Sequence, residues 1–184
     1  MFRLKKQRQF YVKNIISILS SMHRNFTKYF HIATISIKLL AGKEIQIFNY
    51  GNCQRDFTYV DDIVHGIHLV MEHAPEKMNG EDGLPLPPYA VYNIGNNHPE
   101  NLLEFVDILQ EELIAAGVLP ADYDFAAHKK LVSMQPGDVP VTYADTSALE
   151  RDFGFKPATS LREGLRKFAQ WYKDFYCREN EESK

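Results

Sequence analysis

An isolated arginine gives the first indication of chemistry in this sequence. Arg55 directly follows the loop 51–54, where its planar guanidinium could aim two parallel N–H donors at a phosphate. The same side chain could instead pair with Asp56 or Asp61 and only fix the local backbone. Spacing alone favours neither role, so phosphate binding and a structural ion pair both stay open for Arg55.

A second polar group lies in the turn Gln135-Pro-Gly-Asp138. The Asp138 carboxylate could accept hydrogen bonds from the hydroxyl groups of a sugar. Pro, Gly and Asp are also ordinary turn residues. From the residues alone, the turn role is therefore favoured for Asp138.

Two histidines and several carboxylates suggest other chemistry only weakly. His65, His68 and Glu72 fall on one side of a predicted helix, at a spacing that could supply metal ligands. A solvated polar face explains them equally well and is preferred, so we assign no metal site. The adjacent carboxylates Asp61 and Asp62 suit the N-terminus of a helix, and we give them no catalytic role.

Several catalytic signatures are missing from the 184 residues. The sequence has no G-x-G-x-x-G or G-x-x-G-x-x-G turn, no P-loop and no G-x-S-x-G, and none of its ten tyrosines has a lysine four residues later. We therefore assign no catalytic residue and no cofactor-binding residue.

The composition is that of a folded domain with an uneven charge distribution. Hydrophobic residues make up 45% and charged residues 24%, which suits a single core. Residues 1–43 contain nine Lys or Arg and no Asp or Glu, whereas the rest holds all 24 acidic residues. The basic segment fits an organellar presequence, an amphipathic membrane-surface helix or a nucleic-acid arm. An atypical start, such as translated sequence upstream of a truncated gene, is favoured for residues 1–37.

Composition also argues against several partners and compartments. No apolar run approaches the roughly 20 residues that cross a bilayer. The net charge of −3 argues against nucleic acid as the main partner. Cys53 and Cys177 lie far apart and form no C-x-x-C, so we expect neither a disulfide framework nor a zinc site, and a cytoplasmic location.

Hydrophobic periodicity predicts alternating strands and helices in the first half. We expect a strand over 44–48, an extended segment over 55–60, a helix from Asp61-Asp62 to about Pro75, a long loop over 75–88 and a buried strand over 90–94. The first helix has apolar residues at helical spacing: Ile63, Ile67, Val70, Met71 and Ala74. Such a succession is typical of an α/β layer.

The second half is predicted to be mainly helical. Pro99 suits the first turn of a helix whose apolar stripe ends at Gly117, and that stripe consists of Leu102, Phe105, Val106, Leu109 and Leu113. Three further elements are expected: an extended segment over 131–140, a short helix from Asp145 to Gly154, and a last helix that begins with the capping box Ser160-Leu-Arg-Glu163.

One long run carries a family resemblance. Residues 45–63, IQIFNYGNCQRDFTYVDDI, resemble the C-terminal half of NAD-dependent nucleotide-sugar epimerases of the extended short-chain dehydrogenase family. Further segments resemble the UDP-glucuronate 4-epimerase branch, in the same order: 80–88 (GEDGLPLPP), 92–95 (YNIG), 134–139 (MQPGDV), 143–145 (YAD), 154–157 (GFKP) and 171–172 (WY). The resemblance covers roughly residues 38–176 and leaves out the basic segment.

The resemblance implies substrate-binding roles for five residues. In such epimerases the strand that matches the start of the long run lies beside the uracil, which implies this position for Gln46 and Phe48. Arg55 matches the arginine that binds the diphosphate, and Asp138 matches the acid that contacts the ribose. Gln135 stands where many epimerases carry a phosphate-binding arginine, which implies a different diphosphate contact here.

The resemblance also implies what this sequence lacks. Family members are expected to hold NAD on an N-terminal Rossmann half, and a tyrosine of a Tyr-x-x-x-Lys pair takes the proton from the sugar 4-hydroxyl while NAD accepts hydride. Neither the Gly-rich turn nor the pair has a counterpart here. We therefore expect that this chain alone does not bind NAD and does not epimerise.

These observations predict an α/β fold: the C-terminal substrate-binding portion of an extended short-chain dehydrogenase with an incomplete Rossmann sheet. The expected parts are an atypical basic segment (1–37), a nucleotide-sugar-binding portion (38–176) and a polar tail (177–184). The strand over 90–94 would lack sheet neighbours, so we expect exposed apolar surface. The expected partners are a UDP-sugar and either a full-length paralogue or a second copy of the chain.

Two alternatives stay open for function. The chain could be a non-enzymatic binding or assembly module, or a remnant that neither binds nor reacts. It could also be a fragment of a related nucleotide-sugar dehydratase or UDP-hexose epimerase, since these enzymes share the architecture.

Overall fold

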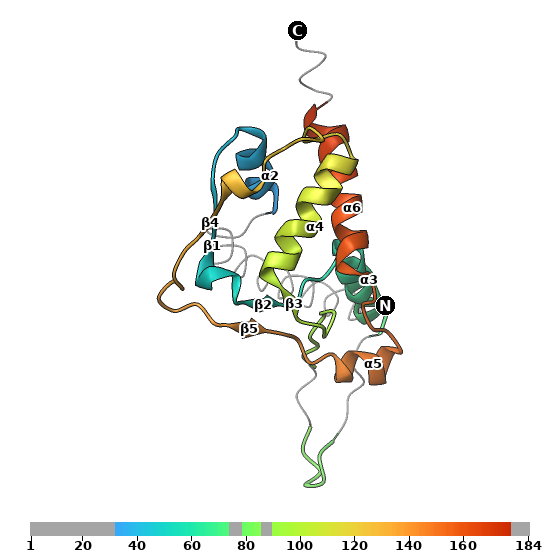
Figure 1. Cartoon of the computed structure of the whole chain (residues 1–184). Helices are drawn as coiled ribbons and strands as arrows, with labels where there is room; N and C mark the ends of the chain where they lie inside the picture. The colour runs from blue at the N-terminus through green and yellow to red at the C-terminus, as the bar shows by residue number, and fades with distance from the viewer. Residues whose placement is uncertain (1–31, 74–78, 86–89, 178–184) are drawn as a thin grey trace.

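A computed structural model describes residues 32–73, 79–85 and 90–177 of the chain (Figure 1). Most of the expected basic segment, up to residue 31, lies outside the described residues. Nearly all of the expected polar tail, from residue 178 on, does too.

The first described element belongs to the core. Helix α2 (Ile32–Leu40) buries Ile35 and Leu39, which are 8% and 0% exposed. The hydroxyl of Tyr123, which lies far along the chain, donates to the Leu39 carbonyl at 2.7 Å. The expected boundary after residue 37 therefore falls inside a helix that packs with the rest of the protein.

Within the described residues, five short strands build two small sheets. The strands are β1 (Ile45–Ile47), β2 (Gln54–Arg55), β3 (Glu100–Asn101), β4 (Lys129–Leu131) and β5 (Val141–Thr142). β1 and β4 form a parallel pair, and the second sheet has the order β3-β2-β5, with β2 antiparallel to β3 and parallel to β5. β1 alternates as predicted, since Ile45 and Ile47 are buried and Gln46 between them is exposed.

Helices α4 (Leu102–Ala115) and α6 (Leu161–Tyr172) run side by side and contribute much of the core (Figure 1). The predicted apolar stripe of α4 is confirmed, because all five of its residues are buried. From α6, Leu165 and Tyr172 pack into the same core and are 3% and 2% exposed. The guanidinium of Arg162 on α6 donates to the buried Glu112 carboxylate on α4 at 3.0 Å, so this buried charge has a partner.

Three helix ends follow the predicted signals: the start of α6 and the ends of α4 and α5. Ser160 Oγ accepts from the backbone N–H three residues later at 3.3 Å, which confirms the predicted start of α6. Gly117, after α4, has φ of 73°, and Gly154, after helix α5 (Ser147–Phe153), has φ of 61°. Both glycines adopt the left-handed conformation that ends a helix without a Cβ penalty.

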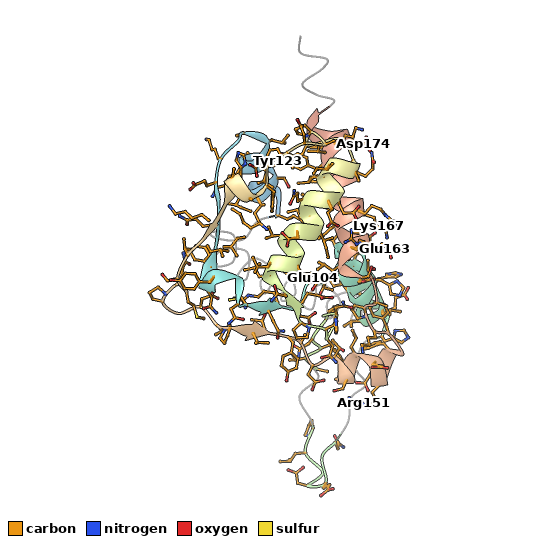
Figure 2. All side chains as sticks on the ribbon, in the orientation of Figure 1. Glu104, Tyr123, Arg151, Glu163, Lys167 and Asp174 are labelled. Carbon is orange, nitrogen blue, oxygen red and sulfur yellow. The ribbon has the colours of Figure 1, made fainter. Side chains whose placement is uncertain are left out.

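Helix α3 (Val60–Glu72) starts within a residue or two of the predicted position and connects to α6. The Asp62 carboxylate in its first turn accepts from the Thr159 N–H at 3.1 Å. On α6, Glu163 and Lys167 lie one turn apart (Figure 2) and are 3.1 Å apart between Oε1 and Nζ. The same ammonium group sits 4.8 Å from the ring centroid of Tyr59, the residue that precedes α3.

Two predictions about the middle of the chain are wrong. Residues 90–94 form no strand, and Val91 is 78% exposed. A strand needs a hydrogen-bonded neighbour to complete its ladder, and this segment pairs with neither sheet of the described residues. Helix α4 begins at Leu102 and not at Pro99, because Asn101 caps it by accepting from two backbone N–H groups of the first turn.

Much apolar side-chain surface stays outside the core, as expected. On α3 the fully buried residue is Gly66, while Val60 and Val64 are 60% and 58% exposed. Among the described helices, none is both long enough and apolar enough to cross a bilayer.

Candidate functional site

Two segments that are distant in sequence run parallel to each other along one side of the molecule. The first passes from β1 through the 3-10 turn η1 (Phe48–Gly51) to β2, and the second leads from β4 to β5. Pairing begins with Ile45 opposite Lys129 and ends with Arg55 opposite Thr142. All five predicted substrate-binding residues lie on these two segments: Gln46, Phe48 and Arg55 on the first, Gln135 and Asp138 on the second.

The structure brings Arg55 and Asp138 into direct contact. Arg55 Nη2 donates to Asp138 Oδ1 at 2.8 Å, although the two residues are 83 positions apart. Arg55 Nη1 donates to the carbonyls of Gln54 and Pro140 at 2.9 and 3.3 Å. The side chains of Arg55 and Asp138 are 17% and 35% exposed, so this ion pair is partly shielded but open to solvent. Such a guanidinium is held in a fixed pose at the surface, where an anion can reach it.

The ion pair that sequence spacing suggested, with Asp56, does not form. Asp56 instead accepts from three backbone N–H groups, those of Asn96, Asn97 and Ala144, at 3.0–3.1 Å. The carboxylate thereby joins β2 to the segment after residue 94 and to the residues after β5. The sequence did not predict that Asp56 binds three backbone N–H groups, because no motif around Asp56 indicates this role.

Gln46 and Phe48 present different surfaces to the site. Gln46 is exposed on β1 opposite Lys130, and Phe48 is half-buried at the start of η1. The next two residues, Asn49 and Tyr50, are left-handed with φ of 50° and 52°. The left-handed conformation is energetically costly for a bulky side chain. A hydrogen bond from the Tyr50 N–H to the Val132 carbonyl on the second segment, at 2.9 Å, stabilises this conformation.

Gln135 and Asp138 close a tight turn. The Asp138 N–H donates to the Gln135 carbonyl at 3.2 Å, and Gly137 between them has φ of 84°. Asp138 Oδ1 also accepts from the Val139 N–H at 2.9 Å. The turn role that the residues alone favoured is therefore present, and it coexists with the contact to Arg55.

The two carboxyl groups whose pKa values are lowered lie at helix α5 and not on the two parallel segments. Hydrogen bonds from Ser147 lower the pKa of Asp145. The Asp145 carboxylate supports the first turn of α5 in this way, but the N-cap residue of α5 is Thr146. Hydrogen bonds from Arg151 and then from Tyr92 lower the pKa of Asp152. Both shifts come from structural contacts.

The polar residues of α3 are dispersed. His68 Nε2 lies 3.5 Å from Glu72 Oε1, and His65 packs its ring against Phe155 with centroids 4.7 Å apart. Within the described ranges, no three His, Cys, Asp or Glu side chains gather closely enough to hold a metal ion.

The fold and the sequence together define the class of the protein. The family model described as GDP-mannose 4,6 dehydratase matches residues 5–168, a range that includes most of the basic segment. The chain therefore belongs to this family of extended short-chain dehydrogenases, which comprises nucleotide-sugar epimerases and dehydratases. The family expected from the motifs is confirmed.

Two relatives in this family are about 40% identical to the chain over most of its length. Protein CapI of Staphylococcus aureus is 43% identical over 138 residues, which are 72% of this chain and 38% of CapI. UDP-glucuronate 4-epimerase 4 of Arabidopsis thaliana is 40% identical over 144 residues, which are 75% of this chain and 30% of that protein.

A solved structure shares the fold. The structure of UDP-glucuronic acid 4-epimerase from Bacillus cereus in complex with UDP-glucuronic acid and NAD matches with a TM-score of 0.58 at 24% identity. The match covers 80% of this chain and 40% of that one. The chain thus spans 30% to 40% of the length of these three proteins.

Proposed function

We propose that this chain binds a UDP-sugar, with UDP-glucuronate as the preferred ligand, on the two parallel segments that carry Gln46, Phe48, Arg55, Gln135 and Asp138. The contact between Arg55 and Asp138 carries the proposal. Two residues whose family counterparts bind the diphosphate and the ribose meet at 2.8 Å from opposite segments. The adjacent diphosphate and ribose of one nucleotide need such neighbouring positions.

In the proposed site, the two charged groups bind different parts of the nucleotide. The Arg55 guanidinium attracts the diphosphate and is pre-positioned by two backbone carbonyls, so little side-chain freedom is lost on binding. Asp138 anchors one arm of that guanidinium and can accept from a ribose hydroxyl with its second oxygen. Gln46 and Phe48 then line the nucleobase side of the site.

The described residues form no site that fits NAD. A dinucleotide site needs free backbone N–H groups at a Gly-rich turn to receive a pyrophosphate. The sequence has no such turn, and the N–H groups of Asn96, Asn97 and Ala144 already bind the Asp56 carboxylate. We therefore propose that these 184 residues bind the sugar nucleotide and do not epimerise it without a separate NAD-binding part.

Calorimetric titration with UDP tests the proposed site. We expect saturable binding to the wild type and a ten- to hundredfold weaker affinity in Arg55→Ala, since a charge-assisted contact contributes about 1.5–3 kcal/mol. Arg151→Ala is the matched control, because Arg151 is an exposed arginine that pairs with Asp152 on α5. Absence of UDP binding to the folded wild type, or equal losses in both variants, would refute the proposal.

Substrate choice and inactivity need a second experiment. UDP-glucuronate should bind more tightly than UDP-glucose or dTDP-glucose, in line with the named relatives. Incubation with NAD and UDP-glucuronate should yield no UDP-galacturonate above the rate of a protein-free control. Enzyme-dependent turnover would overturn the claim that a separate NAD-binding part is required.

A further inference from the structure

The turn between β1 and β2 holds an aromatic residue in an unfavourable backbone conformation. The Asn52 N–H donates to the Asn49 carbonyl at 2.8 Å, and the two residues between them, Tyr50 and Gly51, have φ of 52° and 81°. Turns with positive φ at both central residues are dominated by Asn, Asp and Gly. Gly51 follows this preference, whereas Tyr50 carries the steric penalty that a Cβ meets in the left-handed region.

The surrounding structure prevents this turn from relaxing. A Cβ added to Gly51 would overlap the Leu103 side chain, so the turn is packed directly against helix α4. On its other side, the Tyr50 N–H donates to the Val132 carbonyl at 2.9 Å. The turn is thereby fixed between α4 and the second segment, and Tyr50 is held in its strained conformation.

The Tyr50 side chain contributes little to the fold. It is 62% exposed, so most of the ring surface stays in water. Within the described residues, the ring stacks on no other ring and the hydroxyl has no hydrogen-bond partner. Strained residues cluster at sites that bind ligands, and an exposed ring in a strained turn therefore indicates a contact outside the fold.

Tyr50 also lies within the proposed UDP-sugar site. On the first segment it stands between Phe48, proposed for the nucleobase side, and Arg55, proposed for the diphosphate. Phe48 is half-buried, so only part of its ring can reach a ligand. A pyrimidine base has two flat faces, and the exposed ring of Tyr50, two residues further on, offers a second surface on which one of them can stack.

We infer that Tyr50 binds the nucleobase of the UDP-sugar by stacking its ring on the uracil. The inference rests on the proposed function, because it names a further contact of the same site. Every base has a flat π-face, so stacking does not depend on base identity. Tyr50 therefore contributes affinity for the base and does not discriminate between uracil and thymine.

Calorimetry with UDP and with 5,6-dihydro-UDP, whose saturated base is no longer a flat aromatic ring, tests the stacking. The wild type should bind UDP at least about fivefold more tightly than dihydro-UDP. Tyr50→Gly should weaken UDP binding about five- to 150-fold, which corresponds to the 1–3 kcal/mol of a base–aromatic stack, and should bind the two ligands with about equal affinity. Tyr50→Phe keeps the ring and should keep the affinity of the wild type.

Thermal unfolding separates a binding role from a structural role. Glycine removes the left-handed strain, so Tyr50→Gly should raise the melting temperature by about 2–4 °C although it weakens UDP binding. Asn97→Gly is the matched control, because Asn97 is also left-handed, with φ of 53°, is exposed and lies outside the two parallel segments. Its UDP affinity should equal that of the wild type.

Four results would overturn the inference. Wild-type UDP affinity in Tyr50→Gly, or equal affinity of the wild type for UDP and dihydro-UDP, would remove Tyr50 from a site that still binds UDP. A lower melting temperature in Tyr50→Gly would mean that the ring stabilises the fold. Absence of UDP binding to the folded wild type would refute the proposed function and this inference together.

Discussion

Arg55 and Asp56 are neighbours in the sequence but act on opposite sides of β2. Both side chains are partly buried, but Arg55 contacts the Asp138 carboxylate, whereas Asp56 accepts from three backbone N–H groups. A side chain that satisfies three donors cannot be replaced by one with a single acceptor without leaving donors unpaired. The stability of the site therefore depends on Asp56, and its proposed chemistry depends on Arg55.

Asp56→Asn should destabilise the fold by about 2–3 kcal/mol, because the amide offers one acceptor oxygen and turns an NH₂ group toward a backbone donor. Urea unfolding followed by circular dichroism measures the change. Asp124→Asn is the control, since Asp124 is exposed, accepts from the Ala127 N–H and should cost about 1 kcal/mol or less. Equal losses in the two variants would contradict the role given to Asp56.

The lowered pKa of Asp152 predicts a local pH dependence. Hydrogen bonds from Arg151 and Tyr92 stabilise the ionised carboxylate and hold its pKa below the ordinary 3.8. Because the folded pKa is the lower one, this stabilisation is present above pH 3.8 and is lost as the pH falls through the folded pKa. An NMR titration should place the Asp152 midpoint below 3.8, and Arg151→Ala should raise it. A midpoint that Arg151→Ala leaves unchanged would contradict the assignment.

At the scale of elements, two glycines should respond in opposite directions to the same substitution. A Cβ on Gly95 would lie 2.5 Å from the Cβ of Ala144 and 2.8 Å from Asp56 Oδ2, too close for any side chain. A Cβ on Gly164 in α6 would make an ordinary contact with Tyr59 at 3.4 Å. We expect Gly95→Ala to destabilise by about 1–3 kcal/mol and Gly164→Ala to stabilise by about 0.5–1 kcal/mol.

Thermal unfolding of both glycine variants measures these changes. The melting temperature should fall for Gly95→Ala and rise for Gly164→Ala. A wild-type melting temperature in Gly95→Ala would mean that β2, β5 and the segment after residue 94 do not approach as closely as described.

Sequence patterns predicted the elements whose signals are local. The stripe of α4, the cap at Ser160 and the stop at Gly154 depend on residues a few positions apart, so they are visible in the sequence. β4 (Lys129–Leu131) was missed because Lys-Lys-Leu has no strand pattern and is extended through its pairing with β1. The segment 90–94 was overpredicted for the converse reason, since an apolar run indicates a buried strand whether or not a neighbour exists.

At the scale of the whole molecule, the candidate site forms only when distant segments meet. Arg55 and Asp138 are 83 positions apart, so no spacing rule could pair them. The residues alone left the role of Arg55 open and favoured a turn role for Asp138, and the family resemblance then implied a binding role for both. Asp56 received no functional signal, because its partners are backbone N–H groups that any residue could supply. The basic N-terminal segment, residues 1–43, carries nine basic residues and no acidic ones. The family model matches from residue 5 onward and therefore covers most of this segment, which the motif resemblance did not include.

The central claim is that the two parallel segments, 45–55 and 129–142, form a site for a UDP-sugar. The most direct test is to map amide chemical-shift changes in the ¹⁵N-labelled chain during titration with UDP. We predict that the largest changes fall on these segments, centred on Arg55 and Asp138, and that Arg55→Ala shifts them to about ten- to hundredfold higher UDP concentrations. Saturable changes centred on another part of the chain, or none at millimolar UDP in the folded protein, would contradict the account.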